Sequence, residues 1–348
     1  MKSNLIKYLF FIVVIVLIIV SIYILYIDKN PKTFASEENI KKIEKSNEIN
    51  IGTVGNIGIN PILSNNRDVQ YFLKLVYLPL VDITQDFKTE NKLAKEFSKI
   101  NSKTYIVKLK EDVLWHDGKK FNAQDVIFTV EALKQENIKS IYKENVKNIE
   151  KIEQIDDYTL KIFLTEEVPF FEYKMCFPIL CSSTYDKDTL NSTTVIPNGT
   201  GDYKIKEIKK DIIKISLANK ENGSKTISLI IKESEKELFN AFLKGEIDFF
   251  TTENLDYENY LGTMGYNAIK IENRELDYLV VNNEDVGIRK AINYGINKNN
   301  INYEVFNNKN NICDFPLYYG SYLYLNEHEN VYNLNNAKNS LIESRLEI

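Results

Sequence analysis

The chain has 348 residues, of which 44% are hydrophobic and 12% aromatic, so it can bury a sizeable core and is not a disordered chain. Its 44 Lys and Arg against 49 Asp and Glu give a net charge of −5, which supplies no basic field for nucleic acid. The length predicts two lobes or one large α/β unit. Two histidines and no HExxH motif leave little for a metal site or a histidine-based triad, so no metal or cofactor is predicted.

The N-terminus carries the only segment that is long and apolar enough to suggest a membrane. Leu9–Ile27 is free of charge for 19 residues, and at about 1.5 Å per residue it matches the thickness of the bilayer core. A cleaved signal has a shorter apolar stretch, so the length favours an uncleaved anchor, although Thr33-Phe34-Ala35 offers an alternative cleavage site. We expect an N-terminal transmembrane helix with the bulk of the chain outside the cytoplasm.

The first elements after this segment follow from periodicity. Residues 28–47 are polar and predict a solvated tether. Glu48–Val54 alternates apolar and polar residues, which predicts a strand that opens the folded domain. Asp68–Val76 has helical spacing, and Lys103–Lys110 places its apolar residues on one face of a strand.

The segment Leu114–Val126 predicts a turn followed by a helix. Asp117-Gly118 is a tight-turn dipeptide. Asn122 can cap the helix, and Asp125 lies three residues on, near the free amides of the first turn. These features need no catalytic role.

Two hairpins and a glycine-bearing loop come next. Asn148–Ile155 with Thr159–Leu164, and Tyr203–Ile208 with Ile212–Leu217, predict two strand pairs. The loop Asn198–Tyr203 lacks both the Lys-Ser/Thr and the GxGxxG patterns of a phosphate cradle, so we interpret it as a place where the backbone crosses another segment.

A strand–helix–strand unit then indicates parallel pairing and an α/β fold. Ile227–Lys232 and Ile247–Phe250 are the strands, and Ser234 with Glu237 forms a capping box for the helix between them. Tyr278–Val281 predicts a further strand.

Cys176 and Cys181 stand in the sequence CFPILC. This spacing fits neither a CxxC redox pair nor a paired-knuckle zinc site. Two buried thiols are the simpler interpretation, and a local disulfide is the alternative.

With these motifs in place, the chain resembles the family 5 extracellular solute-binding proteins, which are the oligopeptide-, dipeptide- and nickel-binding components of ABC importers. Five segments carry the resemblance in the family's order: Asn60-Pro61 with Val76–Leu80, Leu114–Leu133, Asn198–Ile205, Leu243–Phe250 and Ile288–Ile301. A later segment, Asn336-Ala337-Lys338 with Leu341, is similar to a helix beyond them.

The resemblance implies a type II periplasmic-binding-protein-like α/β fold of two lobes with an inserted subdomain. The expected divisions are 1–27 membrane anchor or signal, 28–47 tether, 48–65 and 186–275 first lobe, 66–185 inserted subdomain, and 276–348 partial second lobe. Only 47 residues follow Ile301 (348 − 301), where family members continue for well over a hundred. The second lobe is therefore expected to be incomplete.

The function implied by the resemblance is an extracytoplasmic substrate-binding protein that binds peptides, or a nickel chelate, for an ABC transporter. Its expected partners are the permease subunits and the membrane. The candidate ligand-binding residues are Ser64, Asn65, Asn66, Trp115, Tyr278 and Asn282, each of which also has a structural interpretation. The alternative is a truncated, non-transporting scaffold or sensor derived from that family. An enzyme is not expected, because neither histidine stands beside a nucleophile in a recognisable motif.

Overall fold

A computed structural model describes residues 48–55, 58–186, 189–192, 195–217, 226–254, 269, 271, 275–315, 317, 324 and 332–346. The predicted membrane segment Leu9–Ile27 and the predicted tether 28–47 lie outside these ranges. None of the helices within them has both the length and the apolarity needed to cross a bilayer.

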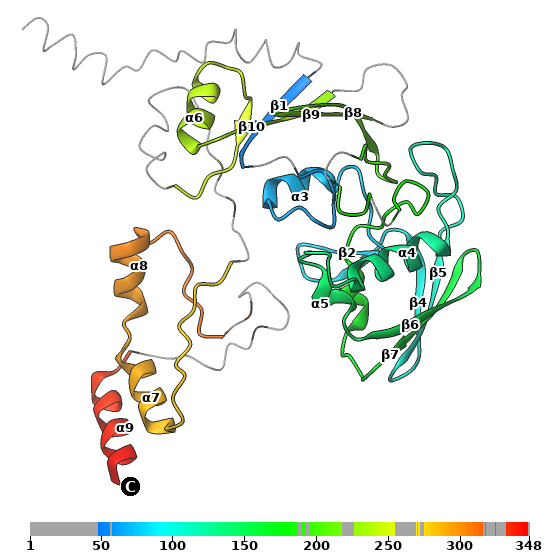
Figure 1. Ribbon diagram of the computed structural model, residues 1–348. Coiled ribbons are helices and arrows are strands. Elements are labelled where there is room, and N and C mark those ends of the chain that lie inside the picture. Colours follow the sequence, from blue (N-terminus) through cyan, green and yellow to red (C-terminus); the bar gives the residue numbers. More distant parts are fainter. Residues whose placement is uncertain are drawn as a thin grey trace, which may run out of the picture. The chain divides into compact units, whose positions relative to one another are not determined.

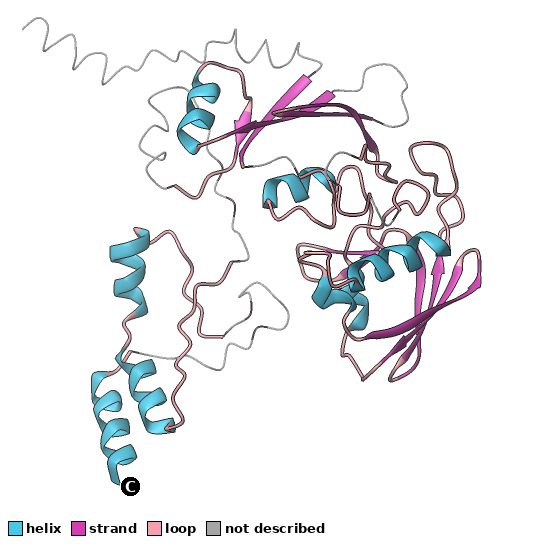
Figure 2. Ribbon diagram, in the orientation of Figure 1, coloured by secondary structure: helices cyan, strands magenta, loops and turns pink. Residues whose placement is uncertain are grey.

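The chain divides into two compact units. The first contains the described residues before Thr84 and those from Thr89 to Ile269. The second contains Thr84–Lys88 and the described residues from Ile271 onward. Figures 1 and 2 show that strands belong to the first of these units and that helices dominate the second.

The opening strand of the first unit lies inside a mixed five-stranded sheet of order β11-β1-β10-β9-β8. Its strands are β1 (Glu48–Val54), β8 (Tyr203–Lys209), β9 (Ile212–Leu217), β10 (Thr226–Lys232) and β11 (Phe249–Phe250). β1 pairs in parallel with β10 on one side and with β11 on the other. The helix α6 (Glu235–Leu243) connects β10 to β11, which confirms the predicted parallel strand–helix–strand unit.

The cap of α6 differs in one detail from the sequence prediction. The Ser234 hydroxyl accepts the amide N–H of Glu237 at 3.3 Å, as expected of a capping box. The Glu237 carboxylate, however, accepts the amide N–H of Glu233, one residue before the cap. Gly245 follows the helix at φ +72°, a left-handed conformation that suits glycine.

A second sheet in the first unit is wholly antiparallel, in the order β4-β5-β7-β6. Its strands are β4 (Ala94–Asn101), β5 (Thr104–Leu109), β6 (Ile149–Asp156) and β7 (Thr159–Leu164), and a small hairpin joins β2 (Val81–Ile83) to β3 (Thr89–Asn91). The helical elements around it are α3 (Arg67–Leu73), α4 (Ala123–Lys134), α5 (Lys143–Val146) and the 3-10 turn η1 (Phe171–Met175). A single hydrophobic core includes side chains from both sheets.

The buried carboxylate of Asp125 organises the start of α4. One of its oxygens accepts the Trp115 indole N–H at 3.0 Å and the Asn122 amide N–H at 3.1 Å. The other accepts the amide and the hydroxyl of Ser182 at 2.9 and 2.7 Å. Four donors therefore compensate the burial of this charge. The predicted Asn122 cap is confirmed, because the Asn122 side chain accepts the amide of Gln124.

The loop Asn198–Tyr203 crosses another stretch of backbone, as the sequence analysis interpreted it. The Gly201 N–H donates to the Val76 carbonyl at 2.8 Å. A Cβ on Gly199 would lie 1.9 Å from the Val76 carbonyl oxygen, and one on Gly201 would lie 2.4 Å from that of Leu75. Only residues without a side chain fit this crossing.

His116 holds the same loop through both ring nitrogens. Its Nδ1 accepts the Gly199 N–H at 3.2 Å, so the ring proton must lie on Nε2, which donates to the Gly201 carbonyl at 2.8 Å. Burial is the main cause that lowers the pKa of His116 below its ordinary value of 6.5, and the charge of Lys204 lowers this pKa further. The folded protein therefore favours the neutral form of the His116 imidazole.

The second unit is built on two closely packed helices, α7 (Val286–Gly295) and α9 (Leu334–Leu346), with α8 (Lys298–Phe306) in the same unit. Their contact uses small residues: a Cβ on Gly287 would lie 2.4 Å from the Ser344 Cβ, and Ala291 is buried. The α7 helix predicted within Ile288–Ile301 and the helix predicted around Asn336–Leu341 are confirmed.

The predicted strand Tyr278–Val281 is wrong. The segment has no regular secondary structure and pairs with no strand among the described residues, and Tyr278, Leu279 and Val280 are exposed, with Tyr278 at 75%. A strand needs a neighbour for its backbone hydrogen bonds, and alternation in the sequence cannot supply that neighbour.

Replacing either crossing glycine should destabilise the first unit. We expect Gly199→Ala and Gly201→Ala each to lower the free energy of unfolding by about 2–3 kcal/mol, because the added Cβ overlaps backbone oxygen atoms. Urea unfolding followed by the fluorescence of Trp115 measures this. Gly58→Ala is the control, since its Cβ would meet Ser64 Oγ at 3.7 Å, an ordinary van der Waals distance, and the substitution should change stability little. Equal effects at all three sites would contradict the crossing.

The stability of the first unit should fall on mild acidification through His116. Because the pKa of His116 is lower in the folded state, the unfolded chain binds a proton first below pH 6.5, so stability is complete above that pH and declines below it. We expect His116→Gln to remove this part of the decline between pH 6.5 and 5. Urea unfolding at a series of pH values tests the prediction, and parallel pH profiles for the two proteins would refute it.

Candidate functional site

The carboxyl ends of β1, β10 and β11 meet along one edge of the mixed sheet, because the three strands run in parallel. Open α/β sheets bind ligands outside the carboxyl ends of their strands. The loop that follows β1 and leads to α3 lies at this edge, since Gly55 donates its N–H to the carbonyl of Lys232, the last residue of β10. This edge is the candidate functional site.

Asn66 serves as the cap that joins β1 to α3. Its side-chain amide donates to the Val54 carbonyl at 2.8 Å, and its side-chain oxygen accepts the amides of Asp68 and Val69 at 3.0 and 3.2 Å. Every polar atom of the side chain is thereby used within the protein. These bonds support the structural interpretation of Asn66, and its contact with a ligand stays a prediction.

Asp68 connects two of the parallel strands at the edge. Its carboxylate accepts the hydroxyl of Thr53 in β1 at 2.7 Å and that of Thr251, just after β11, at 3.3 Å. Arg67 and Glu253 form an ion pair at 2.9 Å that is largely exposed, so it contributes at most about 1 kcal/mol. These bonds hold the rim of the site in place.

Ser64 offers a buried hydroxyl at the site. Its side chain is only 5% exposed, and no described residue bonds its Oγ atom. The backbone around it is fixed, because its N–H donates to the Asn60 carbonyl at 3.0 Å and its carbonyl accepts the Gln70 side chain at 2.6 Å. A buried hydroxyl without a partner costs about 1–3 kcal/mol, which an incoming polar group can recover.

The other predicted residues fall in different places. Asn65 is exposed beside Ser64. Trp115 is buried, donates to Asp125 and meets the Phe121 ring edge-on with centroids 6.1 Å apart, which supports its structural interpretation as a packing residue. Tyr278 and Asn282 are exposed in the second unit.

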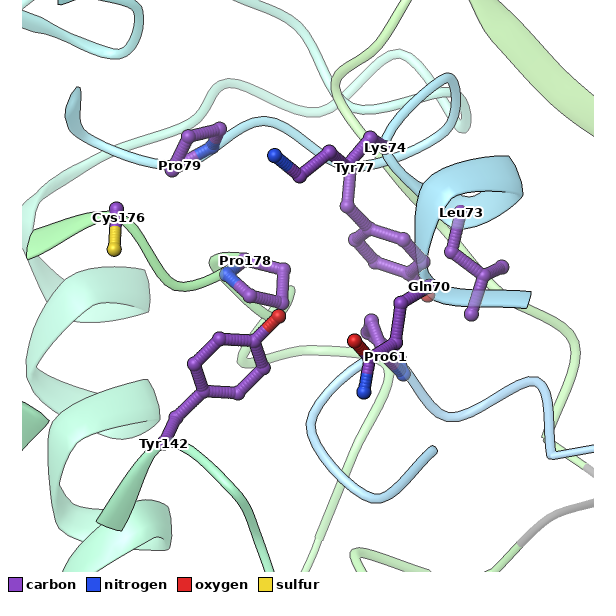
Figure 3. Close-up of a pocket in the computed structure, with 9 residues that line it drawn as sticks. All are labelled: Pro61, Gln70, Leu73, Lys74, Tyr77, Pro79, Tyr142, Cys176 and Pro178. Atoms are coloured by element: carbon purple, nitrogen blue, oxygen red, sulfur yellow. The ribbon is translucent and has the colours of Figure 1, made fainter. Parts of the chain in front are cut away.

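A small cavity lies next to α3 and is shown in Figure 3. Its volume is about 20 Å³, which is room for roughly one water molecule and not for a peptide. Tyr77 and Tyr142 contribute rings to its wall, and burial raises the pKa of Tyr142 to about 12. Cys176 also lines it.

The cysteines and acidic residues of the described part of the chain form neither a disulfide nor a metal-binding cluster. Cys176, Cys181 and Cys313 are all free, so the alternative of a local disulfide between the first two is not realised. Burial raises the pKa of the Cys176 thiol, which disfavours the reactive thiolate. No group of His, Cys, Asp and Glu within the described ranges is arranged to hold a metal ion.

Sequence reasoning missed the residues that shape the loop. The buried Asn60 side chain donates to the Leu190 carbonyl at 2.9 Å and accepts the Ile62 amide at 3.2 Å. Gln70 and Asp68 reach the loop and the strand ends from α3. The only sequence signals for these contacts were the Asn60-Pro61 motif and the acidic first turn of α3. Neither signal identifies a hydrogen-bond partner that is as distant in sequence as Leu190 is from Asn60.

Residues 88–347 match the family described as bacterial extracellular solute-binding proteins, family 5 Middle. The dipeptide-binding protein of Escherichia coli K12 is 25% identical over 238 residues, which cover 58% of this chain and 44% of that protein. The glutathione-binding protein GsiB of Pectobacterium atrosepticum is 28% identical over 149 residues, or 42% of this chain and 29% of that protein.

Solved structures show the same α/β fold. The ABC transporter substrate-binding protein CtaP of Listeria monocytogenes is 25% identical with a TM-score of 0.67, covering 86% of this chain and 65% of that one. NikZ of Campylobacter jejuni, in complex with Ni(L-His), is 24% identical with a TM-score of 0.64, covering 86% and 63%.

The chain spans less than two thirds of the length of each of these four proteins. Within that span, the predicted α/β, periplasmic-binding-protein-like fold is confirmed. The order of the five motifs, the mixed sheet and the match over residues 88–347 lead to one conclusion: the chain belongs to family 5 of the bacterial extracellular solute-binding proteins.

Proposed function

We propose that this chain is the extracytoplasmic substrate-binding protein of an ABC importer and that it binds peptides for uptake. The observation that carries the proposal is the family match over residues 88–347. The names of the two protein relatives, dipeptide-binding and glutathione-binding, favour short peptides over other solutes. A nickel chelate is the alternative ligand class, because the NikZ structure contains Ni(L-His). At 24% identity, the similarity to NikZ supports the fold alone.

The chemistry of the candidate site suits binding without covalent change. The free Ser64 hydroxyl and the exposed amide of Asn65 are neutral hydrogen-bonding groups. Such groups match the N–H and C=O groups of a peptide main chain, which every peptide shares. The site would therefore recognise the backbone of a ligand more than a particular side chain.

The domain division belongs to the same proposal. The mixed sheet would be the first lobe, 48–65 and 186–275, and the antiparallel sheet with α4 would be the inserted subdomain, 66–185. Residues 276–348 would contribute part of the second lobe, where Tyr278 and Asn282 are the candidate contacts.

A non-transporting scaffold or sensor is the second candidate. It is favoured by the segment Tyr278–Val281 of the second unit, where Tyr278, Leu279 and Val280 expose their side chains without a paired strand in the described residues. A surface of this kind fits contact with another protein. Ligand binding distinguishes the two candidates.

Residues 9–27 would hold the protein at the membrane in a single pass, with the remainder outside the cytoplasm. The support is the charge-free length of Leu9–Ile27 and the extracellular character of the family. A tether of 20 residues, 28–47, would then separate the anchor from the folded part.

Peptide binding should stabilise the protein and should depend on Ser64. At a ligand concentration 100 times the Kd, the free energy of unfolding should rise by about 2.7 kcal/mol, so a pool of di- to pentapeptides should raise the Tm. Ser64→Ala should weaken binding about three- to tenfold, because one neutral hydrogen bond is lost. The same variant should leave the free protein as stable as before or slightly more so, since an unpaired buried hydroxyl is removed.

Ser102→Ala, in the exposed turn between β4 and β5, is the matched control. Thermal unfolding gives the stability, and calorimetric titration with a single peptide from the pool gives the affinity. The absence of any shift with peptides or with Ni(L-His) would favour the scaffold. Equal loss of affinity in Ser64→Ala and Ser102→Ala would remove Ser64 from the site.

Deleting residues 1–27 should release the protein from membranes. The full chain should remain in the pellet after alkaline carbonate washing, whereas the deleted form, which also lacks the export segment, should appear in the soluble fraction of the cell lysate. Immunoblotting of both fractions measures this. Full-length protein that washes free, or that is shortened near residue 35, would replace the anchor with a cleaved signal.

A further inference from the structure

The antiparallel sheet of the first unit carries a groove that the proposed function does not use. It is lined from β3, β4, β5 and the segment that enters η1, and its volume is about 600 Å³. This size falls within the range of about 300–1,000 Å³ typical of small-molecule sites. The groove is open to solvent and shares no lining residue with the loop of Ser64.

Three aromatic side chains give the groove its apolar surface. Phe97 of β4 is half-buried, and Tyr105 of β5 is buried against Phe171 with ring centroids 5.0 Å apart. Phe170 is 60% exposed at the groove, and its backbone has φ +53°, a left-handed conformation uncommon for a bulky residue. A large exposed aromatic held in this way presents its ring to solvent instead of packing it in the core.

The charges in the groove leave one carboxylate in excess. Lys99 pairs with Glu167 at 3.0 Å. Glu172 also lines the groove, and no hydrogen bond or ion pair with another described residue engages its carboxylate. Among the lining residues, one cation therefore stands against two anions. The groove has a net negative charge beside its aromatic rings.

The Tyr105 phenol lies at the floor of the groove, and the charges around it affect its pKa. Burial is the largest cause that raises the pKa of Tyr105, the charge of Lys99 opposes the rise, and the carboxylates of Glu172 and Glu167 add to it. An anionic ligand would meet the same repulsion as the phenolate. A cation would instead be attracted by the carboxylates and by the faces of the rings.

We propose that this groove binds an alkylammonium group, with its methylene stem against Phe97 and Phe170 and its charged head at Glu172. A free amine and a lysine side chain presented by a peptide or protein share this chemistry. The proposal requires no ligand at the carboxyl edge of the mixed sheet, so it stands or falls independently of the transport function.

Calorimetric titration of the full 348-residue chain in a mild detergent tests the proposal with three probes. Pentane-1,5-diamine represents a free amine, and Nα-acetyl-lysine amide represents a presented side chain. Nα-acetyl-norleucine amide has a similar stem without the charge. We expect both cations, or one of them, to bind, the norleucine compound not to bind, and added salt to weaken the binding. Binding by the diamine alone identifies a free amine as the source, and binding by the lysine compound alone identifies a presented side chain.

Two variants connect the binding to the groove. Glu172→Gln should weaken it about five- to tenfold, since a charged partner is lost with little change of shape. Phe170→Ala should weaken it about two- to fivefold through the lost ring. Glu150→Gln, an exposed charge on β6 outside the groove, is the matched control and should have no effect. Thermal unfolding verifies that each variant is folded.

The proposal is overturned by three outcomes. They are the absence of binding by both cations, equal binding of the norleucine compound, and an equal loss of affinity in Glu150→Gln and Glu172→Gln.

Discussion

The parallel pairing of β1 on both of its sides is the constraint on which the first unit depends. Glu48–Val54 has no partner close in sequence, and its neighbours β10 and β11 begin at Thr226 and Phe249. The long excursion between them must therefore leave the sheet and return to it. Contacts between distant residues secure the return: the Glu48 carboxylate accepts from Lys214 at 2.7 Å, and the Asp248 carboxylate accepts the Asn50 amide at 2.7 Å. Since loop closure over such a distance is costly, these strands form only together with the rest of the core.

The same constraint creates the candidate site. Once β1, β10 and β11 run in one direction, their carboxyl ends share an edge, and the loop after β1 must pass along it. Asn66 and Asp68 are then occupied in fixing strand ends and the start of α3, and the hydroxyl of Ser64 is left without a partner in the described residues. A rim fixed by these bonds, with the Ser64 hydroxyl and the exposed Asn65 amide left for a ligand, suits the proposed binding of a peptide.

The antiparallel sheet differs from the mixed sheet in its pairing and in its surface. Its strands β4 and β5, and β6 and β7, pair with their neighbours in sequence, whereas β5 and β7 join these two hairpins. The nearby helix α4 is anchored by the fully bonded carboxylate of Asp125. The hydrophobic core of the first unit already contains the aromatic residues that pack against this sheet. A further aromatic residue such as Phe170 can therefore face solvent. The first unit therefore holds the candidate site at the carboxyl ends of the mixed sheet and a separate, negatively charged aromatic groove on the antiparallel sheet.

Local signals determined what the sequence alone could predict. The alternation of Glu48–Val54, the Asn122 cap and the hairpins around Asp157 and Lys210 all depend on residues within a few positions, and the structure confirms them. The order of the motifs along the chain, not its composition, indicated the family. Tertiary structure decided the rest. The partners of Asn66 and Trp115 in the fold are Val54 and Asp125, and Tyr278–Val281 has the pattern of a strand but pairs with no strand of the described ranges. The physical reason is that a hydrogen-bonding side chain or an extended backbone acquires its role from the group that it meets, and that group is chosen by the fold.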